Sequence, residues 1–307
     1  IFATKCDINH VVVTGCPLLK DLMLFRNQLT SIDVTQNPEL EELRIGQQLA
    51  NGNPGLGFLN VTSNPNLEVL HASTAGYLAS IDVTQNTKLR TLDLSYHSIT
   101  SDIDTSSMPD LQFFTAHGND APVLDFTNNP LLMGMGCQDC GLTSLDLTQN
   151  PALYHLTASF NDITSIDLSQ NTLLEEVRIS HSLLTSLDLS NNTLIQILDI
   201  SGHDNLATLN LTPLVNLKSI HAGYNASITE LDLSNNSQLY NVNLRDSPLL
   251  NNLDLRNGNN TNISSFNTQQ TPNLACIDVN DVAYAQANWI NIGGSPNGTT
   301  VFNVNCP

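Results

Sequence analysis

An all-β solenoid of short, stacked, parallel strands is the fold class that this sequence of 307 residues predicts. The nine letters of "LTSLDLSNN", which begin at Leu184, return with small changes at Leu29, Leu142 and Ile163. Within each copy, apolar and polar residues alternate with a period of two, as in a strand with one buried face. A unit this short cannot bury its own leucines, so copies must stack, and we expect one elongated molecule instead of two ordinary domains.

Each repeat has two halves, and we expect one strand in each half and therefore two parallel sheets. Strands of the first series have a leading apolar residue at Ile32, Leu59, Ile81, Ile103, Leu124, Leu145, Ile166, Leu187, Leu209, Leu231 and Leu253. Strands of the second series interleave with these and lead with Leu22, Leu43, Leu70, Leu92, Phe114, Met135, Leu156, Val177, Leu198, Ile220 and Val242. Apart from one step of 27, the first-series leads follow one another by 21 or 22 residues.

An asparagine stands five residues after most first-series leads, where the chain must turn sharply. The positions are Asn37, Asn64, Asn86, Asn129, Asn150, Asn171, Asn192 and Asn236. An inward asparagine can pair with N–H and C=O groups of the turn that would otherwise be buried without a partner.

With its LxxLxLxxN half-repeats, the chain resembles the bacterial leucine-rich repeat proteins, in the subclass whose 21-residue unit reads LxxLxLxxNxLxxLDLxxNxx. The resemblance runs from about Leu18 to Val279. It implies a leucine-rich repeat solenoid with no catalysis of its own that recognises a ligand through one face. Two segments depart from the pattern, "GQQLANGNPGLGF" (46–58), which is longer, and "IDTSSM" (103–108), which lacks the asparagine. We expect both to form bulges.

Both ends of such a stack need covering, and we divide the chain into an N-terminal cap (1–17), leucine-rich repeats (18–273) and a C-terminal cap (274–307). Cysteine pairs confined to the two ends predict disulfide-stapled caps and an oxidising compartment. The pairs are Cys6 with Cys16 and Cys276 with Cys306.

The C-terminal cap also carries a helix signal. We expect Asp281 to cap a short helix that ends at about Asn288, and the sole tryptophan, Trp289, to lie over the last rung of the stack. This end resembles the surface leucine-rich repeat proteins of Bacteroidetes, in which a sorting domain often follows. We therefore expect a monomeric module of a larger surface protein.

The formal net charge of −19 argues against nucleic acid as a partner, because phosphate contacts need basic residues. A negative surface suits cations, basic protein patches or neutral glycans. The chain begins at Ile1 instead of methionine, which we interpret as removal of a signal peptide or trimming. No apolar run approaches the ~20 residues of a membrane span. We expect a secreted or bacterial cell-surface protein.

The two series differ in their outward residues. After the first-series leads stand Asp33, Asn60, Asp82, Asp104, Asp125, Asp146, Asp167, Asp188, Asn210, Asp232 and Asp254, a nearly uniform row. After the second-series leads stand Arg44, His71, Asp93, Thr115, Gly136, Thr157, Arg178, Asp199, His221 and Asn243. Uniform positions suit a structural role and varied ones suit recognition, so we predict the ligand face on the second series. The alternative is that the varied positions are simply unconstrained.

Histidines and aromatic residues gather near the second-series strands, at His71, His97, His117, His155, Phe160, His181, His203, His221 and Tyr224. Aromatic rings beside polar groups suit a sugar or a protein partner. The ligand-binding candidates are Arg44, His71, Asp93, Thr115, His155, Thr157, Phe160, Arg178, Asp199, His221 and Tyr224. Arg178, Asp199 and His221 form the expected centre. Solvated turn histidines and a surface salt bridge are the alternatives.

The aspartate row raises an electrostatic problem, because like charges ~5 Å apart repel by roughly 1 kcal/mol even in water. Hydrogen bonds from the neighbouring Ser and Thr residues or turn amides can offset this, and Ca²⁺ bridging is the alternative. No cofactor is otherwise predicted. Cys137 and Cys140 have the CxxC spacing of redox or zinc sites, but no second pair completes a metal site, and we expect core packing. Their oxidation state is left open.

We predict a non-enzymatic secreted or cell-surface module that binds a protein or glycan ligand. One alternative is a polysaccharide-degrading β-helix enzyme, which needs basic residues beside its acids, whereas Lys5, Lys20, Lys88 and Lys218 are scattered. Another is a purely structural or ice-binding solenoid, which the rows of Ser and Thr favour and the charged row disfavours.

Overall fold

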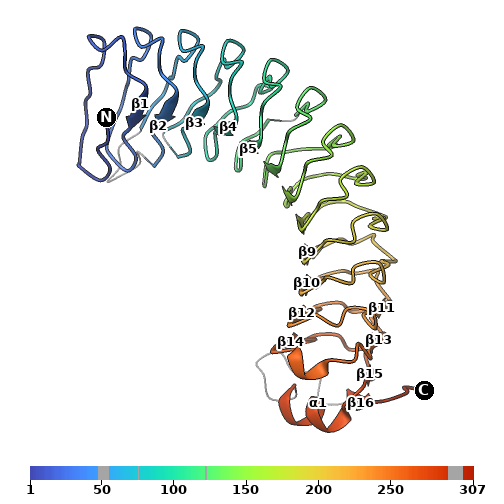
Figure 1. The fold of residues 1–307 in the computed structure, drawn as a ribbon. Coiled ribbons are helices and arrows are strands. Elements are labelled where there is room, and N and C mark those ends of the chain that lie inside the picture. Colours follow the sequence, from blue (N-terminus) through green and yellow to red (C-terminus); the bar gives the residue numbers. More distant parts are fainter. Residues whose placement is uncertain (48–54, 75, 122, 290–299) are drawn as a thin grey trace. The chain divides into compact units, whose positions relative to one another are not determined.

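A computed structural model describes residues 1–47, 55–74, 76–121, 123–289 and 300–307. The chain forms two compact units, Ile1–Leu153 and Tyr154–Pro307. In each unit, strands of three or four residues lie parallel and in register, and each full turn of the solenoid, which we call a rung, contributes one strand to the first sheet (Figure 1). The predicted solenoid with two parallel sheets is confirmed.

The second-series leads lie at the centres of the first-sheet strands, as predicted. In the first unit these strands are β1 (Asp21–Met23), β2 (Glu42–Arg44), β3 (Val69–His71), β4 (Thr91–Asp93), β5 (Phe113–Thr115) and β6 (Gly134–Gly136). In the second unit they are β7 (His155–Thr157), β8 (Glu176–Arg178), β9 (Ile197–Asp199), β10 (Ser219–His221), β12 (Asn241–Asn243) and β14 (Ser265–Asn267).

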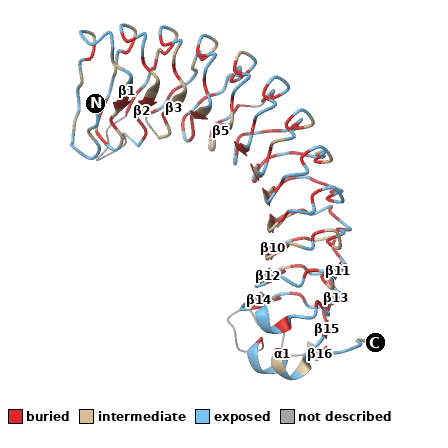
Figure 2. Cartoon of the chain, viewed as in Figure 1, coloured by how far each residue is buried: buried red, intermediate tan, exposed pale blue. Residues whose placement is uncertain are grey.

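Leucine and its neighbours in size fill the inside of each rung. Leu22 and Leu24 in the first unit, like Leu198 and Ile200 in the second, are at most 1% exposed. Buried and exposed residues alternate along every rung (Figure 2). Because this alternation removes apolar surface from water only when rungs stack, burial of these side chains holds the solenoid together.

Buried asparagines tie each rung to the one before it. The Nδ2 atom of Asn64 donates to the carbonyl oxygens of Val34 (2.9 Å) and Asn37 (2.8 Å), and Asn86 donates in the same way to Val61 and Asn64. These carbonyls are closed off from water, where a missing donor is costly. The expected pairing of the inward asparagines with turn carbonyls is confirmed, whereas the expected pairing with turn N–H groups is not, because Oδ1 of Asn64 and of Asn86 has no donor among the described residues. We call these residues the first ladder.

The prediction of a bulge at residues 103–108 is wrong. Met108 takes the ladder position, and the turn keeps its usual hydrogen bond from Met108 N to Thr105 O (3.0 Å). Thr105 replaces the usual inward leucine or valine, and its hydroxyl donates to the carbonyl of Asp125 and to Oδ1 of Asn129. This hydroxyl contacts the following rung, whereas a ladder asparagine donates to the preceding one, so it adds a different link between rungs. Most of the other predicted bulge, 46–58, lies outside the described residues.

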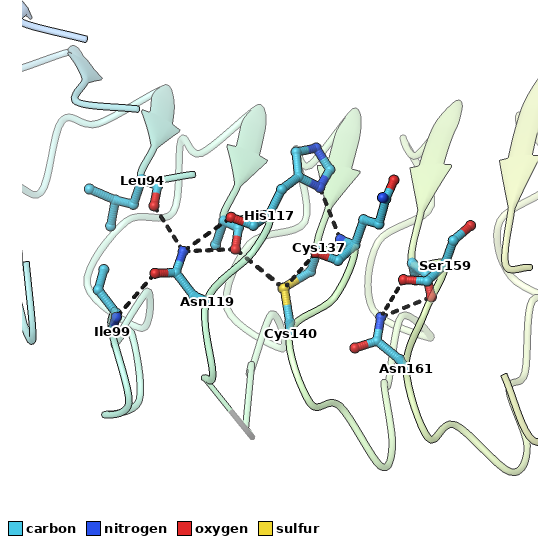
Figure 3. Close-up of a disulfide and its surroundings, with 11 residues drawn as sticks. Leu94, Ile99, His117, Asn119, Cys137, Cys140, Ser159 and Asn161 are labelled. Carbon is cyan, nitrogen blue, oxygen red and sulfur yellow. Dashed lines mark hydrogen bonds between the residues drawn. A yellow bond between two sulfur atoms is a disulfide. The ribbon is translucent and has the colours of Figure 1, made fainter. Parts of the chain in front are cut away.

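A second ladder, which we did not predict as such, occupies the fifth position after the second-series leads. Its members are Asn27, His97, Asn119, Cys140, Asn161, Ser182, His203, Asn225, Ser247 and Thr271. Asn119 shows its chemistry, because its Nδ2 donates to the carbonyls of Leu94 and Ala116 (2.9 Å each) and its Oδ1 accepts from Ile99 N (Figure 3). Unlike the first ladder, it tolerates several side chains.

Two histidines serve in this second ladder. The ring nitrogens of His97 lie 2.8 and 2.9 Å from the carbonyl oxygens of Ala72 and Gly76, and Nδ1 of His203 lies 2.9 Å from Ile200 O. Both imidazoles are buried. They are therefore neither solvated turn residues nor part of an exposed ligand face.

Cys137 and Cys140 are fully buried, which confirms the predicted core packing, and their sulfur atoms are joined in a disulfide (Figure 3). Sγ of Cys140 lies 3.3 Å from Ala116 O, the carbonyl that also accepts from Asn119. The disulfide therefore takes a ladder position.

The predicted disulfide between Cys6 and Cys16 is wrong, since both are exposed free thiols. The backbone holds them in different places. The N–H of Cys6 donates to Oδ1 of Asn27 in the second ladder, whereas the carbonyl of Cys16 accepts from Asn37 in the first ladder. The two ladders run on opposite halves of each rung, so anchoring to different ladders separates the two cysteines.

At the C-terminal end the expected elements are present. Asp281 accepts from Tyr284 N and caps α1 (Val282–Asn288), and a disulfide joins Cys276 to Cys306. Trp289 is fully buried and stacks on Phe266 of β14 with ring centroids 4.7 Å apart. A short 3₁₀ helix, η1 (Asn260–Asn262), precedes this region.

Strands of the first series are confirmed only near this end. The second sheet consists of β11 (Glu230–Asp232), β13 (Asn252–Leu255), β15 (Cys276–Val279) and β16 (Val301–Asn303), and none of the described first-series segments before Glu230 is a strand. In those segments, hydrogen bonds from the first-ladder asparagines join neighbouring rungs in place of strand pairing, as between Asn64 and the carbonyl of Val34.

We expect Asn86→Ala to lower the free energy of unfolding by about 1–3 kcal/mol, because it removes the two hydrogen bonds between rungs that the buried carbonyls of Val61 and Asn64 accept from its carboxamide. Urea denaturation followed by circular dichroism measures this. The matched control is the neighbouring exposed Gln85→Ala, for which we expect a change below about 0.5 kcal/mol. Equal effects of the two substitutions would contradict the structural role of the first ladder.

Burial lowers the pKa of His203, and the nearby imidazole of His181 acts in the same direction. Because the unfolded chain then binds a proton more readily, this residue costs stability as the pH falls through about 6.5 and costs none well above it. We expect the urea midpoint to fall between about pH 7.5 and pH 5, and His203→Asn, which the ladder accepts elsewhere, to reduce that fall. The exposed His10→Asn is the control, and an unchanged slope in His203→Asn contradicts the prediction.

Candidate functional site

The predicted ligand face consists of the outward residues of the first-sheet strands, and we call it the strand face. In the first unit, the register of β2 to β5 places Arg44, His71, Asp93 and Thr115 side by side on consecutive strands. In the second unit, the register of β7 to β10 does the same for Thr157, Arg178, Asp199 and His221. The expected alignment of these residues is present in both units.

Asp93 organises the strand face of the first unit. Its Oδ2 lies 3.5 Å from Nδ1 of His71, and its Oδ1 accepts from Ser95 N. Burial acts to raise the pKa of Asp93, but hydrogen bonds from His71, Ser95 and Thr115 outweigh it and lower the pKa well below the usual range. A lasting negative charge therefore holds three of the predicted residues together.

The neighbouring rungs of the first unit behave differently. Nε of Arg44 lies 3.2 Å from Oε2 of Glu42 on the same strand. On β6, the glycines leave room for rings from the previous rung, because a Cβ atom at Gly134 would come within 2.9 Å of Phe113. The strand face of the first unit therefore carries charged side chains on β2, whereas its outward residues on β6 are glycines without side chains.

In the second unit, two predicted residues bind a residue that we did not predict, Glu176, and a third predicted residue contacts one of them. Its Oε2 lies 3.1 Å from Nδ1 of His155, and its Oε1 accepts from Nε of Arg178. The hydroxyl of Thr157 lies 3.3 Å from Nε2 of His155. We call His155, Thr157, Glu176 and Arg178 the Glu176 cluster.

Arg178, Asp199 and His221 lie on consecutive strands but do not form the expected chain of ion pairs. Asp199 accepts from the N–H and hydroxyl of Ser201, and Nε2 of His221 lies 2.7 Å from Nδ2 of Asn241. Among the described residues, no ion pair joins Asp199 to either neighbour. The charged centre of this unit is therefore at Glu176.

We missed Glu42, Glu176 and Asn241 because only the residue after each lead was considered. In a three-residue strand with a buried centre, the residue before the lead points to the same side as the residue after it. The alternation that predicted the strands contained this signal.

Phe160 and Tyr224 lie just beyond the strands, in the position four residues after the lead. There the backbone adopts the left-handed conformation in every rung for which it is recorded, with φ of 59° at Phe160, 52° at His181 and 56° at Tyr224. Phe160 stacks on His181 with ring centroids 4.6 Å apart and planes 18° apart, and His181 lies 6.4 Å from Tyr224. We call these three residues the aromatic row.

Aspartates on the opposite side of the rungs close local turns. Oδ1 of Asp33 accepts from both the N–H (2.9 Å) and the hydroxyl (2.6 Å) of Thr35, and Asp82 binds Thr84 in the same way. These hydrogen bonds lower the pKa of both carboxyl groups, and repulsion from Asp104 opposes this at Asp82. The prediction that Ser and Thr groups offset the repulsion is confirmed.

A groove on this side lies in the second unit, over β11 and β13, with a volume of about 530 Å³. Its lining combines acids with one base, Arg256, whose guanidinium is bound by Asp254 and by Oδ1 of Asn305. Among the described residues, no three His, Cys, Asp or Glu side chains are close enough to share a metal ion. None of the helices in that part of the chain has the length and apolar character of a membrane span.

No protein-family model matches the sequence, and no curated protein matches it. Several solved structures are similar. The functional domain of InlJ from Listeria monocytogenes, which includes a cysteine ladder, is 26% identical with a TM-score of 0.78, and the match covers 94% of this chain and 58% of that one. This chain therefore spans little more than half of that protein's length.

Two further structures show the same arrangement. The internalin InlF of Listeria monocytogenes is 23% identical with a TM-score of 0.69, over 86% of this chain and 76% of that one. A leucine-rich repeat protein of Leptospira interrogans is 17% identical with a TM-score of 0.66, over 89% and 76%. Together with the stacked rungs and the asparagine ladder, these similarities show that the chain has the leucine-rich repeat fold.

Proposed function

We propose that this chain is a non-enzymatic recognition module that binds a partner protein through the strand face. The observation that carries the proposal is the contrast between the two sides of the rungs. One side repeats a single aspartate turn, whereas the strand face presents a different set of groups on each rung, gathered around Asp93 and Glu176. Partner surfaces are themselves irregular, so individually different rungs provide complementarity that a uniform row cannot.

We propose further that the module works in a secreted or cell-surface setting, as part of a larger protein. Two disulfides, Cys137–Cys140 and Cys276–Cys306, favour an oxidising compartment. The repeat spacing of 21 or 22 residues supports the 21-residue bacterial subclass. The resemblance to Bacteroidetes surface proteins supports a monomeric unit, which light scattering on the purified chain tests directly.

The test is a binding screen of the full chain over an array of cell-surface proteins and glycans, with Ca²⁺ and with a chelator. We expect a protein ligand whose affinity falls by about tenfold or more in Glu176→Gln or Asp93→Asn, because both substitutions remove a charge that orders its neighbours. Asp188→Asn, on the opposite side, is the control. A glycan hit with the same variant pattern would change the ligand class, and a hit weakened only by Asp188→Asn would move the site to the other side.

The proposal requires that these variants lose binding because the strand face is changed and not because the chain unfolds. The ion pairs of Glu176 are partly exposed, so we expect Glu176→Gln to change the free energy of unfolding by less than about 1 kcal/mol. Thermal denaturation measures this. A change of several kcal/mol would mean that the Glu176 cluster has a structural role.

The two alternatives to a binding module have their own assays. Lytic activity on acidic polysaccharides that disappears in Arg256→Ala would place a catalytic site in the groove over β11 and β13, where the base stands beside acids. Thermal hysteresis of the purified chain would indicate ice binding by the Ser and Thr rows.

A further inference from the structure

Aromatic side chains occupy a backbone position that does not suit them. A left-handed residue other than glycine, asparagine or aspartate is uncommon, and a bulky one is strained. The same position is Gly118 and Gly202 in other rungs, with φ of 63° and 75°. In the aromatic row it is Phe160, His181 and Tyr224. Glycine would fold more easily at each of these positions, so the rings are not there for the backbone.

The rings form one continuous row despite the gap at Gly202. His181 leans over this glycine, where a Cβ atom would come within 2.4 Å of Nδ1 of the imidazole. It thereby reaches toward Tyr224, two rungs further on, while its other side stacks on Phe160. With rungs ~4.8 Å apart, the row extends over roughly 14 Å along the edge of the strand face.

The row is open to solvent. Phe160 is 50% exposed and Tyr224 is 45% exposed, and His181 is exposed as well. Contacts within the row leave much of each ring exposed. Exposed aromatic residues grouped in this way are typical of contact sites.

The structure already places one cation on the row. The guanidinium carbon of Arg245 lies 5.3 Å from the centroid of the Tyr224 ring, within the range of a cation–π contact. Nε of Arg245 donates to Oδ2 of Asp246, which holds it there (2.7 Å). At one end of the row, the Tyr224 ring and the Asp246 carboxylate therefore bind the same guanidinium group.

Exposed acids also stand close in sequence to the rest of the row, beside Phe160 and beside Gly202, the position that carries no ring. Asp162 and Asp204 are exposed, and each follows a row position by two residues, after Phe160 and Gly202. The whole chain carries 29 acidic side chains against 10 basic ones. Such a charge attracts cationic surfaces and gives no advantage to a neutral glycan.

We propose that the aromatic row binds arginine-rich segments of the partner protein, with a guanidinium group stacked on Phe160 and paired with Asp162, as Arg245 is stacked on Tyr224 and paired with Asp246. This inference rests on the proposed function, because it names the chemistry of the partner. Arginine suits the row better than lysine, since its planar group stacks on rings while its N–H groups reach carboxylates.

The test measures binding of a fluorescent oligoarginine peptide to the full chain at physiological salt, with oligolysine and an uncharged peptide as comparisons. We expect oligoarginine to bind most tightly. Phe160→Leu, which keeps an apolar side chain but removes the ring, weakens it about three- to fivefold, and Phe160→Trp strengthens it. Phe160→Gly also weakens binding while relieving the backbone strain, so a folded variant is assured.

Tyr240→Leu is the matched control, because Tyr240 is also 45% exposed and in the same unit but lies before its strand, outside the row. It should leave binding unchanged. Equal losses in Tyr240→Leu and Phe160→Leu would indicate diffuse charge attraction and overturn the proposal. So would a lack of binding to oligoarginine, or a neutral polysaccharide whose binding depends on Phe160.

The outcomes separate this inference from the proposed function. A protein ligand that depends on Glu176 but not on Phe160, together with weak oligoarginine binding, would leave the strand face as the site and remove the aromatic row. Absence of both activities would remove both proposals.

Discussion

The whole molecule depends on supplying hydrogen-bond donors to carbonyl groups that stacking buries. A rung of 21 or 22 residues turns sharply, and its turn carbonyls point into the interior, where water cannot reach them. The carbonyls of Val34 and Asn37 each accept one backbone N–H within their own turn and a second hydrogen bond from the carboxamide of Asn64, and the carbonyl of Asn64 in turn accepts from Asn86. These second hydrogen bonds form only when the next rung is in place, so they favour stacking.

That requirement explains which positions vary. In the first ladder, one short side chain must donate to two carbonyls of the preceding rung, so asparagine recurs. In the second ladder the acceptors are met by Asn119, by the imidazole of His203 and by backbone groups, so that even a disulfide at Cys140 fits. The outward residues do not have to satisfy these buried carbonyls, so they can differ from rung to rung.

The strand face and the aromatic row both follow from the geometry of the repeat. Short strands leave both flanking side chains outward, which gathers Glu176, His155 and Arg178 although they come from two strands. The turn after each strand needs a left-handed residue, and it projects Phe160 and Tyr224 beside the face. Because both features arise from the repeat, neighbouring rungs place their groups at regular spacing, which suits an extended partner.

The sequence by itself determined the solenoid, the register of the strands, the buried asparagines and the cap around Trp289, since each depends on local periodicity or on a short-range signal such as Asp281 before the helix. Only the tertiary structure decided which side chains meet. It paired Arg178 with Glu176 instead of Asp199, buried His203, and left Cys6 and Cys16 apart by anchoring them to different ladders. The physical reason is that side-chain contacts between rungs depend on rotamers and on competing partners nearby, such as Ser201 for Asp199, which no repeat pattern encodes.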